Sequence, residues 1–176
     1  MLNVANEMTP EDQDSFMRLY IAVGIAVHMA QLVEKELALV LLLPTHSEAK
    51  RLSPADEINK TKEEVDRMTY GQLLRRLKRV ATIRPEFEQR LDEGLRKRNF
   101  LIHHFFDFYG ADIAITSVRE RMIAELESIE ELLHPLYQKF RELSYESFKA
   151  WGMTEEQTQR KIGQLEADFE LRRKSR

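Results

Sequence analysis

The stretch that decides the fold is residues 69–110, which read TYGQLLRRLKRVATIRPEFEQRLDEGLRKRNFLIHHFFDFYG. Thr69-Tyr70-Gly71-Gln72 opens a first helical run, whose apolar residues recur at helical spacing up to Val80. Pro85 begins a second run, which Tyr109-Gly110 ends. Its apolar face consists of Phe87, Leu91, Leu95, Ile102 and Phe105. The pattern predicts a helix hairpin.

Before this hairpin, the spacing of apolar residues predicts a helix of roughly thirty residues that begins at Thr9-Pro10 and stops before Pro44. Glu11 and Asp12 suit the positive end of its dipole. Gly24 lies among small residues and indicates a close crossing of two helices.

Three further segments flank this core. Residues 44–68 are polar and predict a connector, with a short helix after Ser53-Pro54 and Glu57 placed for a capping box. A helix is expected from about Asp112 to Phe148, kinked or split at Pro135. Beyond it, Thr154 and Gln157 predict a second capping box. The charged helix that follows has only a narrow stripe of Ile162, Leu165 and Phe169, which is typical of an arm.

Composition agrees with an all-α fold. The chain has 176 residues, of which 43% are hydrophobic and 32% charged, with only six Gly and five Pro. The absence of cysteine excludes disulfides, thiolate metal sites and Cys nucleophiles. The first residues carry no basic region before an apolar run, and Glu34, Lys35 and Glu36 interrupt the apolar stretch Leu19–Leu43. We therefore expect a cytoplasmic protein with no membrane span.

The formal net charge is −3, so any affinity for nucleic acid must come from a local patch. The hairpin offers one between Arg75 and His104, where basic residues outnumber acidic ones. Candidate RNA contacts there are Arg75, Arg79, Arg96 and Lys97. The alternative is that these are solvated faces of two amphipathic helices, paired with their own acids.

Within the patch, Asn99 and His103 are four residues apart and share a helix face, and the long side chain of Arg98 can reach the same point. Arg offers a bidentate fork to a phosphate and stabilises added negative charge, and imidazole can take or give a proton near neutral pH. Such a pair needs no metal if an RNA 2′-hydroxyl is the nucleophile. The alternative is a buried, hydrogen-bonded anchor.

Two further observations concern partners of these side chains. Glu34 lies within the apolar first helix, and a buried carboxylate there would need a partner, for which Arg98 is the candidate. The five histidines follow no His-x-x-Glu or His-x-x-x-His pattern, so we expect no metal site and no cofactor.

The run RNFLIHHFF, set on the third of several long helices, resembles the HEPN superfamily of "higher eukaryotes and prokaryotes nucleotide-binding" helical domains. The hallmark of that family is Arg, a polar residue, a short apolar spacer and His. Arg98, Asn99 and His103 match it, over a resemblance that covers roughly residues 10–145.

The resemblance implies an up-down four-helix bundle over residues 1–150. Residues 151–176 would form a charged helical arm, in the same domain or on a neighbour. It also implies a homodimer whose two motifs share one cleft, and a metal-independent ribonuclease of the toxin–antitoxin or phage-defence type. Arg98 would hold the scissile phosphate, His103 would be the general acid/base, and Asn99 would orient the substrate or His103. His104 has no fixed family role and could supply a second imidazole.

This sequence departs from the family in one respect and differs from the usual charge of RNA-cleaving proteins in another. Toxins paired with a nucleotidyltransferase antitoxin carry a Tyr two residues beyond the His, where this chain has Phe105. Its net charge is negative, whereas a net positive charge would suit an RNA-cleaving protein better. The competing hypothesis is therefore a non-catalytic dimerising module that binds a nucleotide or a partner protein. A third is a structural bundle whose motif only ties helices together.

Overall fold

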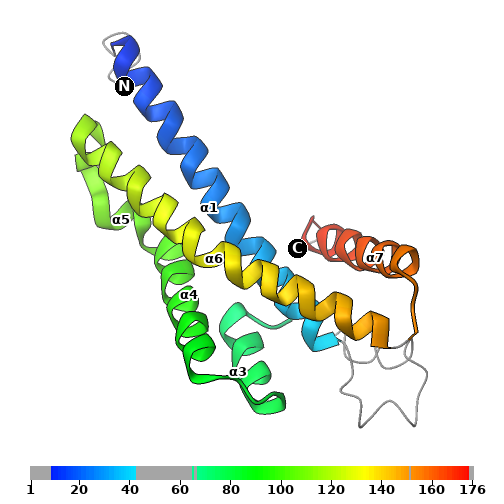
Figure 1. Ribbon diagram of the computed structural model, residues 1–176. Coiled ribbons are helices and arrows are strands. Elements are labelled where there is room, and N and C mark those ends of the chain that lie inside the picture. The colour runs from blue at the N-terminus through cyan, green and yellow to red at the C-terminus, as the bar shows by residue number, and fades with distance from the viewer. Residues whose placement is uncertain (1–8, 43–64, 66, 151, 175–176) are drawn as a thin grey trace. The chain divides into compact units, whose positions relative to one another are not determined.

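The computed structural model describes residues 9–42, 65, 67–150 and 152–174, and these residues form helices without any strand (Figure 1). The predicted all-α class is therefore confirmed. The elements are α1 (Pro10–Leu42), α3 (Tyr70–Val80), α4 (Pro85–His103), α5 (Phe105–Tyr109), the 3-10 helix η2 (Gly110–Ala114), α6 (Thr116–Ala150) and α7 (Glu155–Lys174).

The chain divides into two compact units, which are described separately. The first unit comprises the chain up to Gln31 together with Asp92–His134, and the second comprises Leu32–Leu91 and Pro135–Arg176. Helices α1, α4 and α6 each contribute one part to each unit, whereas α3 and α7 belong to the second alone. The up-down four-helix topology and the division at residue 150 stay predictions.

Three of the predicted helix starts are confirmed by side-chain caps. The Thr9 hydroxyl accepts a hydrogen bond from the backbone N–H of Asp12 at 3.1 Å. Thr69 and Gln72 form a reciprocal capping box at the start of α3, and Thr154 and Gln157 form another before α7. Each box satisfies two backbone N–H groups that a helix terminus leaves without a partner. The helix expected after Ser53-Pro54 lies outside the described residues.

The second arm of the hairpin was predicted as one helix to Tyr109, and this is wrong at one residue. Helix α4 ends at His103, and His104, with φ −131° and ψ −12°, separates it from α5. The hydrogen bonds nevertheless continue across this point, from His104 N–H to the Phe100 carbonyl (2.9 Å) and from Phe108 N–H to the His104 carbonyl (2.8 Å). The break is thus a local distortion at His104, and the helical hydrogen bonds continue across it.

The following helix also differs from the prediction. Residues Gly110–Ala114 form the 3-10 helix η2, and α6 begins only at Thr116. Gly110 has φ +51°, a conformation that favours glycine, which explains why the chain changes direction there. Helix α6 is not split at Pro135 but continues through it, although proline removes one N–H donor from the helix.

The core of the second unit surrounds the last part of α1, where Val33, Leu37 and Leu42 are almost completely buried. Apolar side chains of α3 belong to the same core, and the rings of Phe87 and Phe140 meet edge to face at 6.2 Å between centroids. In α7, Ile162 is buried. The predicted arm therefore carries at least one core residue.

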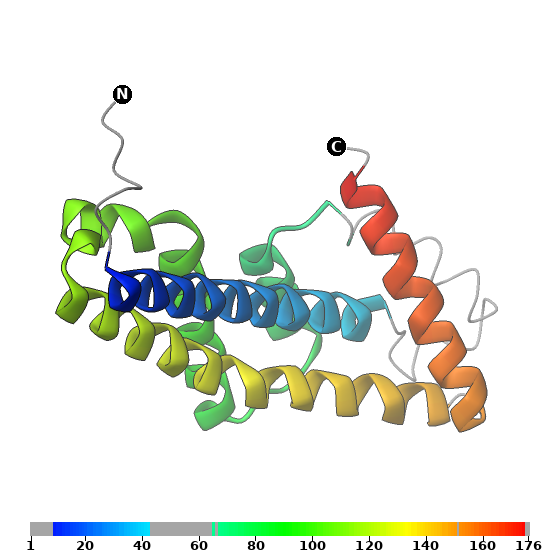
Figure 2. The ribbon, with the colours of Figure 1, turned by 90° about the horizontal axis from the view of Figure 1, so that it is seen from above.

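In the first unit, α1 and α6 lie side by side in Figures 1 and 2, joined by the ion pair of Arg18 and Glu120 at 3.0 Å. Lys97 of α4 pairs with Glu125 of α6 at 2.5 Å. The close crossing expected at Gly24 is wrong for the chain itself, because a Cβ placed on Gly24 would meet nothing within 4 Å.

Helix α1 is also long and apolar enough to span a membrane by length and composition, with a mean hydropathy of 1.6 over its best 18-residue window. Only 28% of that window is buried, although Leu19 and Ala26 in the first unit and Val33 and Leu37 in the second are core residues. This single helix does not settle where the protein resides.

Candidate active site

Arg98 and Asn99 lie on α4 and contact each other. Arg98 Nη1 donates a hydrogen bond to Asn99 Oδ1 at 3.2 Å, and both side chains are half-buried. The guanidinium is therefore held against the amide, in a residue that stays partly exposed. A fork held in this way is suited to binding a phosphate, because its donors are fixed before the anion arrives.

His103 is the last residue of α4, one turn beyond Asn99, and its side chain is exposed. The neighbouring His104 is exposed as well, and the two imidazole ring centroids are 6.2 Å apart with an interplanar angle of 65°. The distortion at His104 thus presents two adjacent imidazoles to solvent. Both are accessible to an external proton donor or acceptor.

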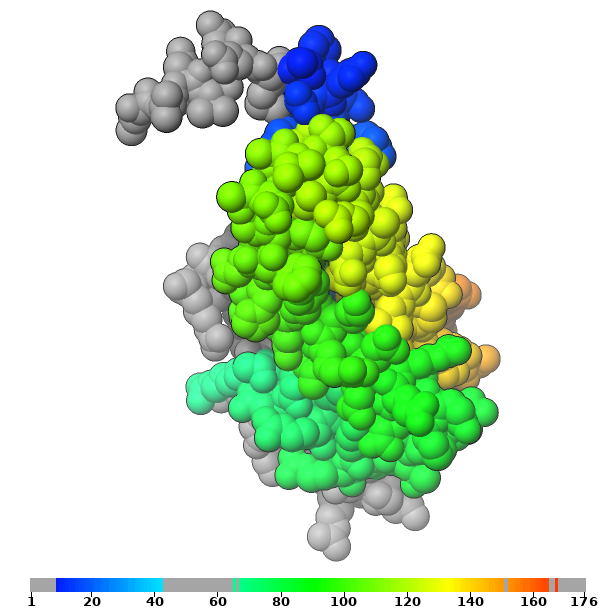
Figure 3. Space-filling model, turned by 90° about the vertical axis from the view of Figure 1, so that its left-hand side faces the viewer, coloured from blue at the N-terminus to red at the C-terminus, as the bar shows by residue number. Residues whose placement is uncertain are grey.

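An aromatic cluster follows the two histidines directly in the chain. Phe105 is buried at its centre, with Phe100, Phe106 and Tyr109 packed against it at centroid distances of 5.8, 5.5 and 5.2 Å. Phe108 packs edge to face on Phe100 but is 72% exposed. The chain around α5, light green in Figure 3, forms part of the visible surface in that view.

Tyr109 closes this cluster. Burial, with a smaller contribution from the nearby carboxylate of Glu125, raises the pKa of its phenol above the ordinary value of 10.0. The phenol therefore stays protonated near neutral pH. It can donate a hydrogen bond there but cannot act as a base.

The predicted RNA contacts divide between the two units. Arg96 is exposed on α4 in the first unit, and Lys97 beside it is engaged with Glu125. Arg75 and Arg79 are exposed on α3 in the second unit, where Arg75 Nε donates to the Gly71 carbonyl at 3.3 Å. Helix α3 itself carries no acidic residue, but its Lys78 forms an ion pair with Glu88 of α4 at 2.9 Å.

Glu34 is only half-buried, and the deeply buried carboxylate of α1 is that of Glu36, two residues further on. Glu36 lies 3.9 Å from the guanidinium of Arg141, which also donates a hydrogen bond to the Tyr137 hydroxyl. Glu34 belongs to the second unit and Arg98 to the first, so their pairing stays a prediction.

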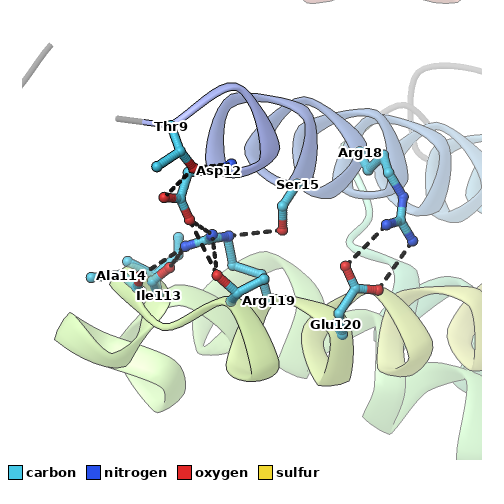
Figure 4. Close-up of polar contacts among 9 residues, drawn as sticks. Thr9, Asp12, Ser15, Arg18, Ile113, Ala114, Arg119 and Glu120 are labelled. Atoms are coloured by element: carbon cyan, nitrogen blue, oxygen red, sulfur yellow. Dashed lines mark hydrogen bonds and ion pairs between the residues drawn. The ribbon is translucent and has the colours of Figure 1, made fainter. Parts of the chain in front are cut away.

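Sequence reasoning missed the polar centre of the first unit, Arg119 (Figure 4). Its side chain is fully buried, and its guanidinium lies 4.2 Å above the ring of Phe16. All three nitrogens donate hydrogen bonds. The acceptors are Ser15 Oγ (2.9 Å), the carbonyls of Ile113 (3.0 Å) and Ala114 (2.9 Å), Asp12 Oδ1 (2.5 Å) and Thr116 Oγ1 (2.9 Å).

This network fixes the first turns of α1 to η2 and to the start of α6. It also lowers the pKa of Asp12 below 3.8, through hydrogen bonds from Thr9 first, then from Arg119 and Thr116. A sequence signal existed, since Arg119 lies between Val118 and Met122 on an apolar face. The pattern did not identify its partners, because Ser15 and Asp12 lie 104 and 107 residues earlier in the chain and two further acceptors are backbone carbonyls.

Among the described residues, no group of three or more His, Asp or Glu side chains is placed to hold a metal ion. No protein-family model, no curated protein and no solved structure matches this chain.

Proposed function

We propose that this protein is a metal-independent ribonuclease of the HEPN type that cleaves RNA with Arg98 and His103. The observation that carries the proposal is the arrangement on one helix. Arg98 donates a hydrogen bond to the Asn99 amide, and the exposed His103 follows Asn99 by four residues, one helical turn, at the end of α4.

In this reaction, one imidazole removes the proton from the RNA 2′-hydroxyl, whose oxygen attacks the adjacent phosphorus. The bond from phosphorus to the 5′-oxygen breaks, and that oxygen takes a proton from a general acid. The products are a 2′,3′-cyclic phosphate and a 5′-hydroxyl end. Arg98 stabilises the charge that builds up on the phosphate oxygens, and Asn99 holds the guanidinium in place. His103 is the general acid/base, and the exposed His104 is available as a second imidazole.

Two surface features support RNA as the substrate. Phe106 and Phe108 are 46% and 72% exposed directly after the two histidines, and exposed aromatic rings can stack unpaired bases. Arg96 is exposed on the same helix as Arg98 and can contact the phosphate backbone.

The proposal includes the context that the resemblance implies. The protein would act in the cytoplasm as a homodimer whose two motifs meet, in a toxin or phage-defence role with an antitoxin or another partner protein. Each protomer would form an up-down four-helix bundle.

A second candidate function is a non-catalytic module that binds a nucleotide or a partner protein. The observation that favours it is the hydrogen bond from Arg98 to Asn99, which suits an anion-binding side chain that is positioned by its neighbour. In that case, Arg98 would bind a phosphate group without any chemistry at His103.

The experiment that separates the two is cleavage of an RNA oligonucleotide in EDTA, beside the same sequence made with 2′-deoxyribose throughout. We expect cleavage of the RNA only, with 2′,3′-cyclic phosphate ends, and its loss in Arg98→Ala and His103→Ala. Uncleaved RNA at micromolar concentrations of folded protein would contradict the ribonuclease. Binding of ATP that Arg98→Ala abolishes would then support the module.

A further inference from the structure

One ion pair joins the helix that carries the motif to α6, and the proposed chemistry does not use it. Lys97 Nζ lies 2.5 Å from Glu125 Oε1, and the two side chains are only 34% and 31% exposed. Lys97 directly precedes Arg98 in the chain, and both residues of the pair belong to the first unit. The contact therefore fixes α4 on α6 at the residue next to the motif.

The apolar packing of α4 is interrupted at this point. Gly94 is buried before it and Leu101 after it, whereas residues 95–100 are all half-buried or exposed. Lys97 follows Gly94 by three residues and precedes Leu101 by four, so it lies on the face of α4 that the core covers. A charged contact to α6 thus takes the place of a buried apolar side chain on that face.

Glu125 also lies near the part of the chain that follows the two histidines. Burial and, after it, the carboxylate of Glu125 raise the pKa of the Tyr109 phenol, so the phenol and the carboxylate are close enough to interact. Tyr109 packs in turn on the buried ring of Phe105, at 5.2 Å between centroids. Because Lys97 precedes the histidines and Tyr109 follows them, Glu125 interacts with both flanks of the segment that contains them.

The ion pair also bears on the role of Lys97. A lysine that neutralises an RNA phosphate needs an available charge, and the ammonium of Lys97 is already neutralised by Glu125. A partly exposed ion pair contributes little to stability, because desolvation and lost side-chain entropy offset its attraction. It does restrict where the two helices can lie, since the ammonium and the carboxylate must stay in contact.

We infer that Glu125 is a positioning residue, which through Lys97 holds residues 98–104 on α6 in the arrangement that the cleavage reaction needs. The inference rests on the proposed function for the reaction. The positioning itself follows from the ion pair and from the place of Lys97 on α4. Lys97 is then a partner of Glu125 and not an RNA contact.

The test is to measure kcat and KM for cleavage of an RNA oligonucleotide by Glu125→Gln, Lys97→Gln and the double variant. Each single change should lower kcat at least about tenfold and leave KM within about twofold, because displaced catalytic groups affect the transition state more than the bound substrate. The double variant should be no worse than either single one, since both remove the same contact. The matched control is Glu127→Gln, at an exposed position of α6, which should change neither constant.

The alternative role of Lys97 predicts changes of opposite sign. If Lys97 contacts RNA, Lys97→Gln raises KM, whereas Glu125→Gln lowers KM because it releases the ammonium. That result overturns the inference. A kcat that Glu125→Gln leaves unchanged overturns it too, as does a double variant whose loss equals the product of the two single losses.

Hydrogen exchange tests the positioning without any RNA. In Glu125→Gln, the backbone amides of residues 98–108 should exchange at least about tenfold faster, while the melting temperature stays within about 5 °C of wild type. Exchange equal to that of wild type overturns the inference, and so does faster exchange throughout the described helices, which would show a general loss of structure. Faster exchange confined to residues 98–108, in a protein whose wild type does not cleave RNA, supports the positioning and contradicts only the ribonuclease.

Discussion

The first unit contains two arginines in contrasting surroundings, Arg119 and Arg98. Arg119 is fully buried and donates five hydrogen bonds to acceptors on α1, η2 and α6. Arg98 is half-buried on α4 and donates a hydrogen bond to Asn99, and the two exposed histidines follow at the end of the same helix and directly after it.

The difference shows what each side chain can do. A guanidinium whose donors are all satisfied by the protein has nothing left for a substrate and serves to hold elements together. One that is oriented and still reaches solvent can bind an anion. The same residue type is thus an anchor at one site and a candidate catalytic group at the other. Replacing the anchor should therefore change stability, and replacing the candidate catalytic group should change RNA cleavage without changing stability.

The largest effect is expected for Arg119→Ala. It leaves the acceptors around Asp12, Ser15 and the Ile113 carbonyl without their donor, and removing one partner from a buried ionic network costs roughly 3 to 5 kcal/mol of unfolding free energy. Urea denaturation followed by circular dichroism measures it. A loss below about 1 kcal/mol would show that the network contributes little and would remove the anchor from the comparison.

Next in size is the contrast between the two neighbouring imidazoles. His103→Ala should lower the rate of RNA cleavage at least about a hundredfold, the usual contribution of a general acid/base. His104→Ala should lower it less, because His104 follows the end of α4 and lies outside the motif. Single-turnover cleavage rates measure both variants. If His104→Ala were the more damaging, the catalytic imidazole would be His104.

A smaller effect is expected at the capping box of α3, in a helix that contains neither arginine. Thr69→Ala removes the side-chain acceptor for the Gln72 N–H and should cost about 1 kcal/mol of unfolding free energy. Thr82→Ala, at an exposed threonine outside any helix, is the matched control and should change it by less than about 0.5 kcal/mol. Equal losses in the two variants would contradict the role of the cap.

The smallest effect is the response of the anchor to acid. The folded state lowers the pKa of Asp12 below 3.8, so the stabilisation is fully present above pH 3.8 and is lost as the pH falls through the lower folded pKa. Asp12→Asn should therefore be less stable than wild type at neutral pH, and the gap should narrow on acidification below pH 3.8. Thermal melts across this range measure the gap. A gap that is constant with pH would show that Asp12 does not titrate with folding.

Local signals made much of this fold predictable. Two helix starts were predictable from Thr69 with Gln72 and from Thr154 with Gln157, because capping depends on residues only three positions apart. The distortion at His104 was not predictable, since apolar periodicity runs through it from Leu101 to Phe105. Continuity of α6 through Pro135 was not predictable either, because proline lowers helix propensity without forbidding a helix.

The site was predictable only as far as one helix extends. The shared helix of Arg98, Asn99 and His103 follows from their spacing. By contrast, the engagement of Lys97 with Glu125 depends on a helix 28 residues away in sequence. The choice of Glu36 over Glu34 as the buried carboxylate depends on packing around all sides of α1, which no single-helix pattern contains.

The most direct test of the account is to measure RNA cleavage and unfolding free energy on the same preparations of Arg98→Ala and Arg121→Ala, the latter an exposed arginine of α6 in the same unit. We predict that Arg98→Ala loses cleavage at least about a hundredfold while its unfolding free energy stays within about 1 kcal/mol of wild type, and that Arg121→Ala keeps both. If Arg98→Ala instead cleaves RNA normally, or loses stability as Arg119→Ala should, Arg98 is a second anchor and the proposed active site is wrong.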